Sequence, residues 1–119
     1  MTPMLALVVV VTGAAAATVR YAVSLLLAPR VAWAVLVVNV AGSAVGGAVL
    51  GLAERAAIGA DLRVVLLTGL CGGLTTFSTL SVETVQLLQS GRARTAFASV
   101  TANLVLGIGA AALVYLALR

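Results

Sequence analysis

The sequence contains no histidine, a single cysteine, Cys71, and three acidic residues among 119. Without histidine, and with one thiol, the chain lacks the ligands of a Cys/His zinc site, and an intrachain disulfide bond is excluded. Charged residues make up only 8% of the chain, whereas an ordinary soluble domain has about 25%. This scarcity of charge excludes a water-soluble fold for so short a chain and predicts an integral membrane protein.

Hydrophobic residues dominate what is present, at 63% of the chain with a mean hydropathy of +1.25. They form four runs, each long enough for a membrane-spanning helix, which needs about 20 residues. The predicted spans cover about residues 4–28, 31–53, 63–89 and 95–118. We therefore expect an all-α protein whose single four-helix transmembrane domain fills residues 1–119, with no soluble catalytic domain. Short connections are expected near Pro29–Arg30, Glu54–Arg63 and Ser90–Arg94.

The net charge of +4 comes from seven arginines, with no lysine in the chain. Such an excess favours a nucleic-acid binder only when the basic residues cluster on a soluble face. Here the arginines stand mostly one at a time between hydrophobic runs. Their expected partners are therefore membrane lipid headgroups, and not nucleic acid.

The arginines also bear on how the chain inserts into the membrane. Four helices place both termini and the 54–63 loop on one side, with three arginines there and three or four on the other. A positive-inside bias this close to zero predicts a chain that inserts both ways and pairs as an antiparallel, dual-topology dimer. The alternative is a partner or insertion factor that fixes one orientation. The arginines are Arg55, Arg63 and Arg119 on the first side, and Arg30, Arg92, Arg94 and, if it reaches that surface, Arg20 on the other.

Polar residues inside the predicted spans are costly in lipid and therefore indicate function. In the second span, Asn39 precedes pairs of small residues spaced four apart, which let helices approach closely. Packing explains those small residues, but the Asn39 amide needs a hydrogen-bond partner, either another helix or a permeating ion. In the fourth span, Ser99, Asn103 and Gly107 follow one another every four residues. The small-residue pairs are Gly42/Gly46, Ser43/Gly47 and Gly47/Gly51.

The third span is rich in residues that weaken a helix. Gly69, Gly72 and Gly73 lower helix propensity, and the serines and threonines at positions 75–81 compete for backbone hydrogen bonds. We predict a helix broken near residues 72–76, where freed carbonyl groups could coordinate a cation, as at the half-helix breaks of transporters. The alternative is a simple kink that neighbouring side chains fill.

Beyond this break, helical spacing aligns hydroxyl groups that suit a small anion. Hydroxyls and amides donate hydrogen bonds without a fixed charge, and a phenyl ring has a weakly positive edge. A cation pathway or proton relay is expected to use carboxylates, and Glu83 is the only acid inside a predicted span. Its position toward the helix end makes an interfacial role the alternative to a pore role. The residues after the break form two stripes along the predicted helix. One stripe consists of Phe77, Leu80, Ser81 and Thr84, and the other of Thr76, Thr79, Glu83 and Gln86.

Three motifs follow one another along the chain: Gly13 through Arg20–Tyr21, Val37–Ser43 (VVNVAGS), and Gly72–Thr79 (GGLTTFST) with Glu83 behind it. The third motif resembles the signature of the Fluc (CrcB-type) fluoride channels, and the first two resemble motifs in that family's first and second helices. The third motif is long and specific, whereas the other two would be weak alone. The resemblance covers all four spans in order.

The resemblance implies an antiparallel, dual-topology homodimer of four-helix subunits with two fluoride pores. Members of the family export fluoride passively across the plasma membrane of microbial cells, which lowers its cytoplasmic concentration and toxicity, and they are not enzymes. A structural sodium ion (Na+), which is not transported, is implied at the dimer centre. Its ligands are backbone carbonyl groups at positions that correspond to Gly72 and Thr75.

The resemblance also assigns roles to side chains. Phe77 corresponds to a phenylalanine whose ring edge contacts fluoride, and Asn39 to the pore asparagine. Ser78 and Thr79 match hydroxyl residues beside that ring, and Arg20 matches an arginine that shapes the anion-attracting vestibule. The whole expected pore consists of Asn39, Phe77, Ser78, Thr79, Leu80 and Asn103.

Two positions depart from the family pattern. Leu80 stands where a second phenylalanine is usual, so half of the aromatic contact with fluoride is missing, and Ser99 stands where a tyrosine is common. These departures raise the alternative of an obligate heterodimer, in which a paralogous subunit supplies the intact ring.

Two other classes of membrane protein share parts of this pattern. Small multidrug-type antiporters are also short four-helix, dual-topology dimers, but they use a glutamate deep in the first helix, and this chain has no acid before Glu54. A membrane assembly factor would explain the glycine-rich packing face, but not the aligned hydroxyls, Asn39 and the broken third helix together. Neither class is preferred over a fluoride channel.

Overall fold

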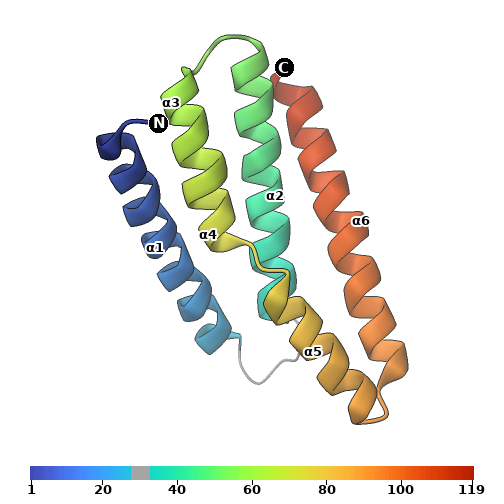
Figure 1. Cartoon of the computed structure of the whole chain (residues 1–119). Coiled ribbons are helices and arrows are strands. Elements are labelled where there is room, and N and C mark those ends of the chain that lie inside the picture. The colour runs from blue at the N-terminus through green and yellow to red at the C-terminus, as the bar shows by residue number, and fades with distance from the viewer. Residues whose placement is uncertain (28–32) are drawn as a thin grey trace.

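A computed structural model describes residues 1–27 and 33–119, which form four long helical passes (Figure 1). The first, second and fourth passes are α1 (Pro3–Leu26), α2 (Trp33–Glu54) and α6 (Ala93–Leu118). The third pass consists of α3 (Ala60–Val64), the π-helical η1 (Val65–Cys71), α4 (Gly72–Leu74) and α5 (Ser78–Gln89). All four passes are long and apolar enough to cross a membrane, which confirms the expected all-helical, multi-pass membrane protein.

Short connections link the passes, and Figure 1 places both termini and the loop at residues 55–59 at one end of the bundle. The turn at residues 90–92 lies at the other end, where Gly91 adopts a φ of +77° that glycine tolerates without strain. The predicted connection at Pro29–Arg30, with the adjoining ends of the first two predicted spans, lies outside the described residues.

Helices α2 and α6 pack closely along their length because α2 presents glycine to the backbone of α6. A Cβ atom on Gly47 would overlap the carbonyl oxygen of Ala111, and one on Gly51 would lie 2.9 Å from the carbonyl oxygen of Tyr115. Small residues at such positions let helix backbones approach each other closely in lipid. Close packing matters there because lipid tails are as apolar as the side chains, so that burying apolar side chains stabilises the contact little. The expectation of a packing role for this glycine stripe is confirmed.

A second close contact joins α1 to the first half of the third pass. A Cβ atom on Gly69 would lie 3.1 Å from the carbonyl oxygen of Val9, and one on Gly73 would overlap the carbonyl oxygen of Gly13. The bundle therefore consists of two tightly packed helix pairs, α1 with η1 and α4, and α2 with α6.

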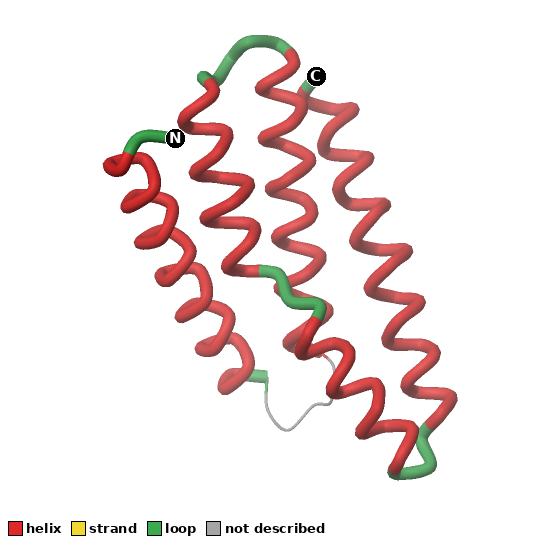
Figure 2. Tube along the Cα trace, viewed as in Figure 1, coloured by secondary structure: helices red, strands yellow, loops and turns green. Residues whose placement is uncertain are grey.

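The third pass changes course at residues 75–77, here called the crossover segment, which separate α4 from α5 (Figure 2). Thr75 has an extended backbone, with φ −83° and ψ 156°, and the helix resumes at Ser78. Before this segment the pass packs against α1, and after it α5 packs against α6. The crossover segment thus carries the chain from one helix pair to the other.

The helical part of the third pass extends further than the sequence predicts. The predicted interruption begins at residue 72, but Gly72–Leu74 are helical. Gly73 serves the contact with α1, and the helix ends only where Asn39 of α2 binds the backbone of Thr76. The π-helical turns of η1 are a further departure, with the Gly72 N–H directed at the Leu67 carbonyl five residues earlier.

Candidate functional site

The side chain of Asn39 joins α2 to the crossover segment through the backbone of Thr76. Its Nδ2 donates to the Thr76 carbonyl at 3.1 Å, and its Oδ1 accepts from the Thr76 N–H at 2.8 Å. One carboxamide thereby satisfies both backbone polar groups of a residue that has left the helix, which is essential where water is scarce. The same Nδ2 donates to Oδ1 of Asn103 at 3.0 Å, and Nδ2 of Asn103 donates to the Ser99 carbonyl at 2.9 Å. We call Asn39, Thr76 and Asn103 the polar junction.

The Thr76 hydroxyl, on a residue only 8% exposed, organises the start of α5. It accepts from the Thr79 N–H at 3.1 Å and lies 3.1 Å from the Thr79 hydroxyl and 3.3 Å from the Ser78 hydroxyl. The amide groups in the first turn of this 12-residue helix carry the positive end of its dipole. Hydroxyl donors and a positive helix end therefore meet at the crossover segment.

A groove of about 330 Å³, here called the asparagine groove, lies between α2, the crossover segment and α6. It brings together four of the six predicted pore residues, Asn39, Phe77, Leu80 and Asn103. The Phe77 side chain is 82% exposed, so one wall of the groove is an uncovered ring while the floor is polar. The lining residues are Asn39, Ser43, Thr75, Thr76, Phe77, Leu80, Asn103, Leu104, Gly107 and Ile108.

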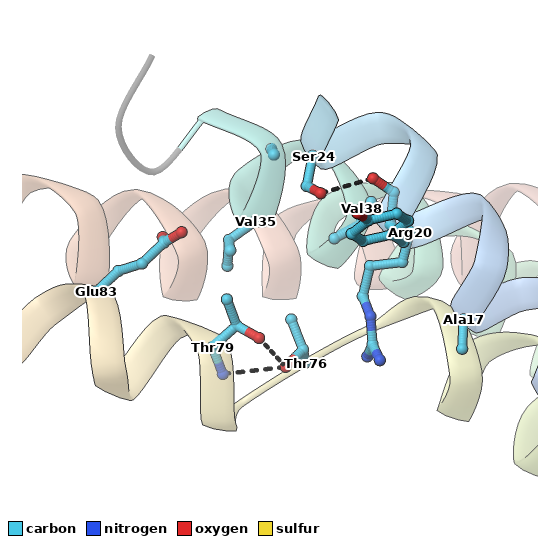
Figure 3. A pocket seen from close by; sticks show the side chains of 10 residues that line it. Ala17, Arg20, Ser24, Val35, Val38, Thr76, Thr79 and Glu83 are labelled. Atoms are coloured by element: carbon cyan, nitrogen blue, oxygen red, sulfur yellow. Dashed lines mark hydrogen bonds between the residues drawn. The ribbon is translucent and has the colours of Figure 1, made fainter. Parts of the chain in front are cut away.

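A second cavity, here called the arginine pocket, lies between α1, α2 and α5 and has a volume of about 270 Å³. The Arg20 guanidinium lies at one side of it and donates to the Thr75 carbonyl at 3.0 Å. Figure 3 shows Glu83 on the side of the pocket opposite Arg20, and Oε2 of Glu83 is buried with no hydrogen-bond partner among the described residues. The lining residues are Ala17, Arg20, Tyr21, Ser24, Ala34, Val35, Val38, Thr76, Thr79 and Glu83.

The remaining predicted residues take different positions. Thr79 lines the arginine pocket and not the asparagine groove, and Ser78 lines neither cavity. The Gly72 carbonyl lacks its usual helical donor because the Thr76 N–H is directed to Asn39. The Thr75 carbonyl accepts from Arg20. No group of three or more His, Cys, Asp or Glu side chains is placed to bind a metal in the part of the chain that the structure describes.

Two residues of the site were not among the predicted pore residues. Thr76 lines both cavities and separates them, and Ser43 lines the asparagine groove. The sequence contains a signal for Thr76, which shares a helical stripe with Thr79 and Glu83. The sequence shows Ser43 as a member of a small-residue pair and as the last residue of the Val37–Ser43 motif, and neither predicts its place in the groove, which comes from the packing of α2 on α6.

This arrangement suits an ion that needs hydrogen-bond donors and a positive potential. Two cavities meet at Thr76, one with the Arg20 guanidinium and, on its opposite side, the Glu83 carboxyl group, and one with amide, hydroxyl and phenyl groups. Together with the amino-terminal end of α5, the donors among these groups serve an anion without a fixed charge at the centre.

The chain matches the family model described as CrcB-like protein, Camphor Resistance (CrcB), over residues 7–115. It is 37% identical over 109 residues to the fluoride-specific ion channel FluC 1 of Nitrobacter hamburgensis, covering 87% of this chain and 86% of that relative. The FluC protein of Shewanella amazonensis is 42% identical over 98 residues, covering 79% of each chain. That of Methylobacterium radiotolerans is 36% identical over 113 residues, covering 90% of this chain and 79% of the relative.

These relatives are named as ion channels, a class without enzymatic activity, so the prediction that this chain is not an enzyme is confirmed. The matched region extends over all four helical passes. It includes the third-helix motif from which the family was predicted, and that prediction is confirmed as well. The chain belongs to the CrcB family.

Proposed function

We propose that this protein is a fluoride channel that lets fluoride leave the cell passively across the plasma membrane. The observation that carries the proposal is the polar junction of Asn39, Thr76 and Asn103, in which Thr76 lies between two cavities that contain hydrogen-bond donors. The names of the relatives support fluoride as the ion. The multidrug-type antiporter gains no support, since α1 contains no acidic residue.

In the proposed mechanism, fluoride enters the arginine pocket, where the Arg20 guanidinium attracts it. It then exchanges water for the hydroxyl groups beside the crossover segment, which Ser78 and Thr79 supply. At the asparagine groove it meets the positive edge of the Phe77 ring and the Asn103 amide, which Asn39 holds in place by a hydrogen bond. Each step replaces hydration by fixed dipoles, as selectivity filters do.

The crossover segment is proposed to lie within the membrane. Fifteen helical residues precede it in the third pass and 12 follow it, so it stands near the middle of a pass long enough to span the bilayer. Irregular backbone at that depth is tolerated only where protein or a watery cavity surrounds it. The polar junction and the two cavities supply those surroundings.

A second copy of the chain is proposed to cover the asparagine groove. Phe77 is 82% exposed and Ile108 67% exposed beside a polar floor, and amides facing lipid would be costly. The near balance of arginines at the two ends supports an antiparallel, dual-topology pair. Such a dimer would place two asparagine grooves in opposite orientations.

The implied sodium ion is proposed to bind at this dimer centre through the carbonyl groups of Gly72 and Thr75. Gly72 is exposed and its carbonyl has lost its helical donor, so the oxygen is free for a cation. The Thr75 carbonyl oxygen already accepts a hydrogen bond from Arg20, and its second lone pair is proposed to bind the cation. Unwound backbone carbonyls bind sodium in this way in transporters.

Removal of sodium tests that site. Dialysis of the reconstituted protein into N-methylglucamine is expected to lower fluoride efflux at least about fivefold. The reason is that the helix ends beside Gly72 and Thr75 in the two subunits then lose a shared counter-charge. Added sodium chloride should restore the rate, whereas potassium chloride should not. Efflux that survives exhaustive sodium removal would count against the ion.

Fluoride efflux from liposomes that contain the purified protein alone tests the channel itself, with chloride as the control anion. Phe77→Ala is expected to slow efflux roughly fivefold, because the ring edge contributes about 1 kcal/mol to the desolvated ion. Phe97→Ala is the matched control, since Phe97 is also exposed, at 76%, but lines neither cavity. Folded wild-type protein that releases no fluoride, or releases chloride equally fast, would refute the proposal in its homodimeric form.

The heterodimer is the second candidate, and Leu80 is the observation that favours it, because Leu80 lies in the asparagine groove beside Phe77. In a self-sufficient homodimer, Leu80→Phe is expected to raise efflux roughly fivefold, since a second ring adds about 1 kcal/mol to the aromatic contact. Leu80→Met controls for side-chain bulk and should leave the rate unchanged. If wild-type protein conducts only after addition of a paralogous subunit, the heterodimer is the correct assembly.

A further inference from the structure

We infer that Ser43 is a further fluoride-binding residue, whose hydroxyl group contacts the ion in the asparagine groove. The inference rests on the proposed channel function and extends it to a side chain that the family motif does not mark as a pore residue. Ser43 is half-buried on α2, one helical turn after Asn39, and lines the same groove as Asn39 and Asn103.

The Ser43 hydroxyl has no hydrogen-bond partner among the described residues. This is unusual for the groove, because the Thr75 hydroxyl donates to the Cys71 carbonyl at 2.8 Å and the Thr76 hydroxyl bonds to Thr79. A serine in a membrane helix normally satisfies its hydroxyl on the carbonyl four residues earlier, as Ser81 does on Phe77 at 2.9 Å. Ser43 therefore offers the groove a donor that the protein itself does not use.

The opposite wall leaves room for a ligand in front of this hydroxyl. Gly107 of α6 faces Ser43, and a Cβ atom on Gly107 would lie 3.5 Å from the Ser43 Oγ. The absence of a side chain at Gly107 keeps the space beside the hydroxyl open. Only a few residues further along, Gly47 holds the two helices in direct backbone contact, so the opening is local to the groove.

The side chain of Asn39 has no hydrogen-bond donor left for an ion. Its Nδ2 donates to the Thr76 carbonyl and to Asn103, while its Oδ1 accepts from the Thr76 N–H. An ion that approaches an intact polar junction thus finds no free N–H on Asn39. The Ser43 hydroxyl, one turn away on the same helix face, supplies a donor without disturbing the junction.

Fluoride efflux measured over a range of fluoride concentrations tests this inference. Ser43→Ala, which removes the hydroxyl at nearly constant volume, is expected to lower the rate at low fluoride about tenfold and to raise the half-saturating concentration. Gly107→Ala, which fills the space before the hydroxyl, should act in the same direction. Ser90→Ala is the control, because the Ser90 hydroxyl donates to the Leu87 carbonyl in the turn between α5 and α6.

The outcomes separate this inference from the channel proposal. Wild-type liposomes that release no fluoride would refute the channel, whatever the variants do. Wild-type efflux with an unchanged Ser43→Ala concentration dependence would overturn the role of Ser43 and leave the channel intact. A Ser43→Ala variant that loses rate at all concentrations equally, with no shift in half-saturation, would also overturn it, since that result indicates less folded protein rather than weaker binding.

Discussion

Asn39→Asp is expected to abolish fluoride efflux, with a loss of roughly 100-fold or more. Aspartate cannot donate to the Thr76 carbonyl or to Oδ1 of Asn103, which lie 3.1 Å and 3.0 Å from the Asn39 amide nitrogen. Two lost hydrogen bonds cost about 1–3 kcal/mol each when the acceptors stay buried, and the new carboxylate oxygen would repel both. The rate is measured as fluoride release from liposomes, with size-exclusion chromatography as the test of folding.

Gln89→Glu is the matched control for Asn39→Asp. It also converts an amide to an acid, but at the exposed carboxy-terminal end of α5, and it should retain the wild-type rate. Asn103→Ala removes only one of the three hydrogen bonds of Asn39 and is expected to cause a smaller loss, of roughly tenfold. If Asn39→Asp retained more than a tenth of the wild-type efflux, the polar junction would not be the centre of the pathway.

The four passes could be predicted from hydropathy because the membrane sets one dominant requirement, a long apolar run in which the helix satisfies its own backbone. The course of the third pass could not be predicted in the same way. Gly72 and Gly73 have low helix propensity, yet they remain helical because α1 packs against them through Gly13. Propensity is a local property, and here a tertiary contact overrides it.

The partner of Asn39 was equally beyond local sequence analysis. The need for a hydrogen-bond partner follows from one amide in an apolar helix, but Thr76 and Asn103 stand 37 and 64 residues away in the chain. The sequence left open whether another helix or an ion satisfies the amide. In the structure, Thr76 and Asn103 from two other segments of the chain bind the Asn39 amide. Asn39 therefore positions the crossover segment.

Gly47→Ala is expected to disrupt the pairing of α2 with α6, with a loss of about 3 kcal/mol or more in the free energy of unfolding. The added Cβ would overlap the carbonyl oxygen of Ala111 and lie 2.9 Å from its carbonyl carbon. A flexible side chain could move away, but backbone atoms in the middle of a helix cannot. The measurements are the yield of monodisperse protein in detergent and its thermal unfolding midpoint.

Gly46→Ala is the matched control, one residue earlier on the same helix. Its Cβ would meet only the Cys71 Sγ and a Leu67 methyl group, both at 3.9 Å, which is ordinary van der Waals contact. Alanine also favours the helix over glycine, by up to about 1 kcal/mol, so Gly46→Ala should be as stable as the wild type or more so. Equal stability of the two variants would mean that α2 and α6 do not touch as described. The spacing of glycines in the sequence marks both positions as part of a packing face, and only the approach of Ala111 distinguishes the one that cannot carry a side chain.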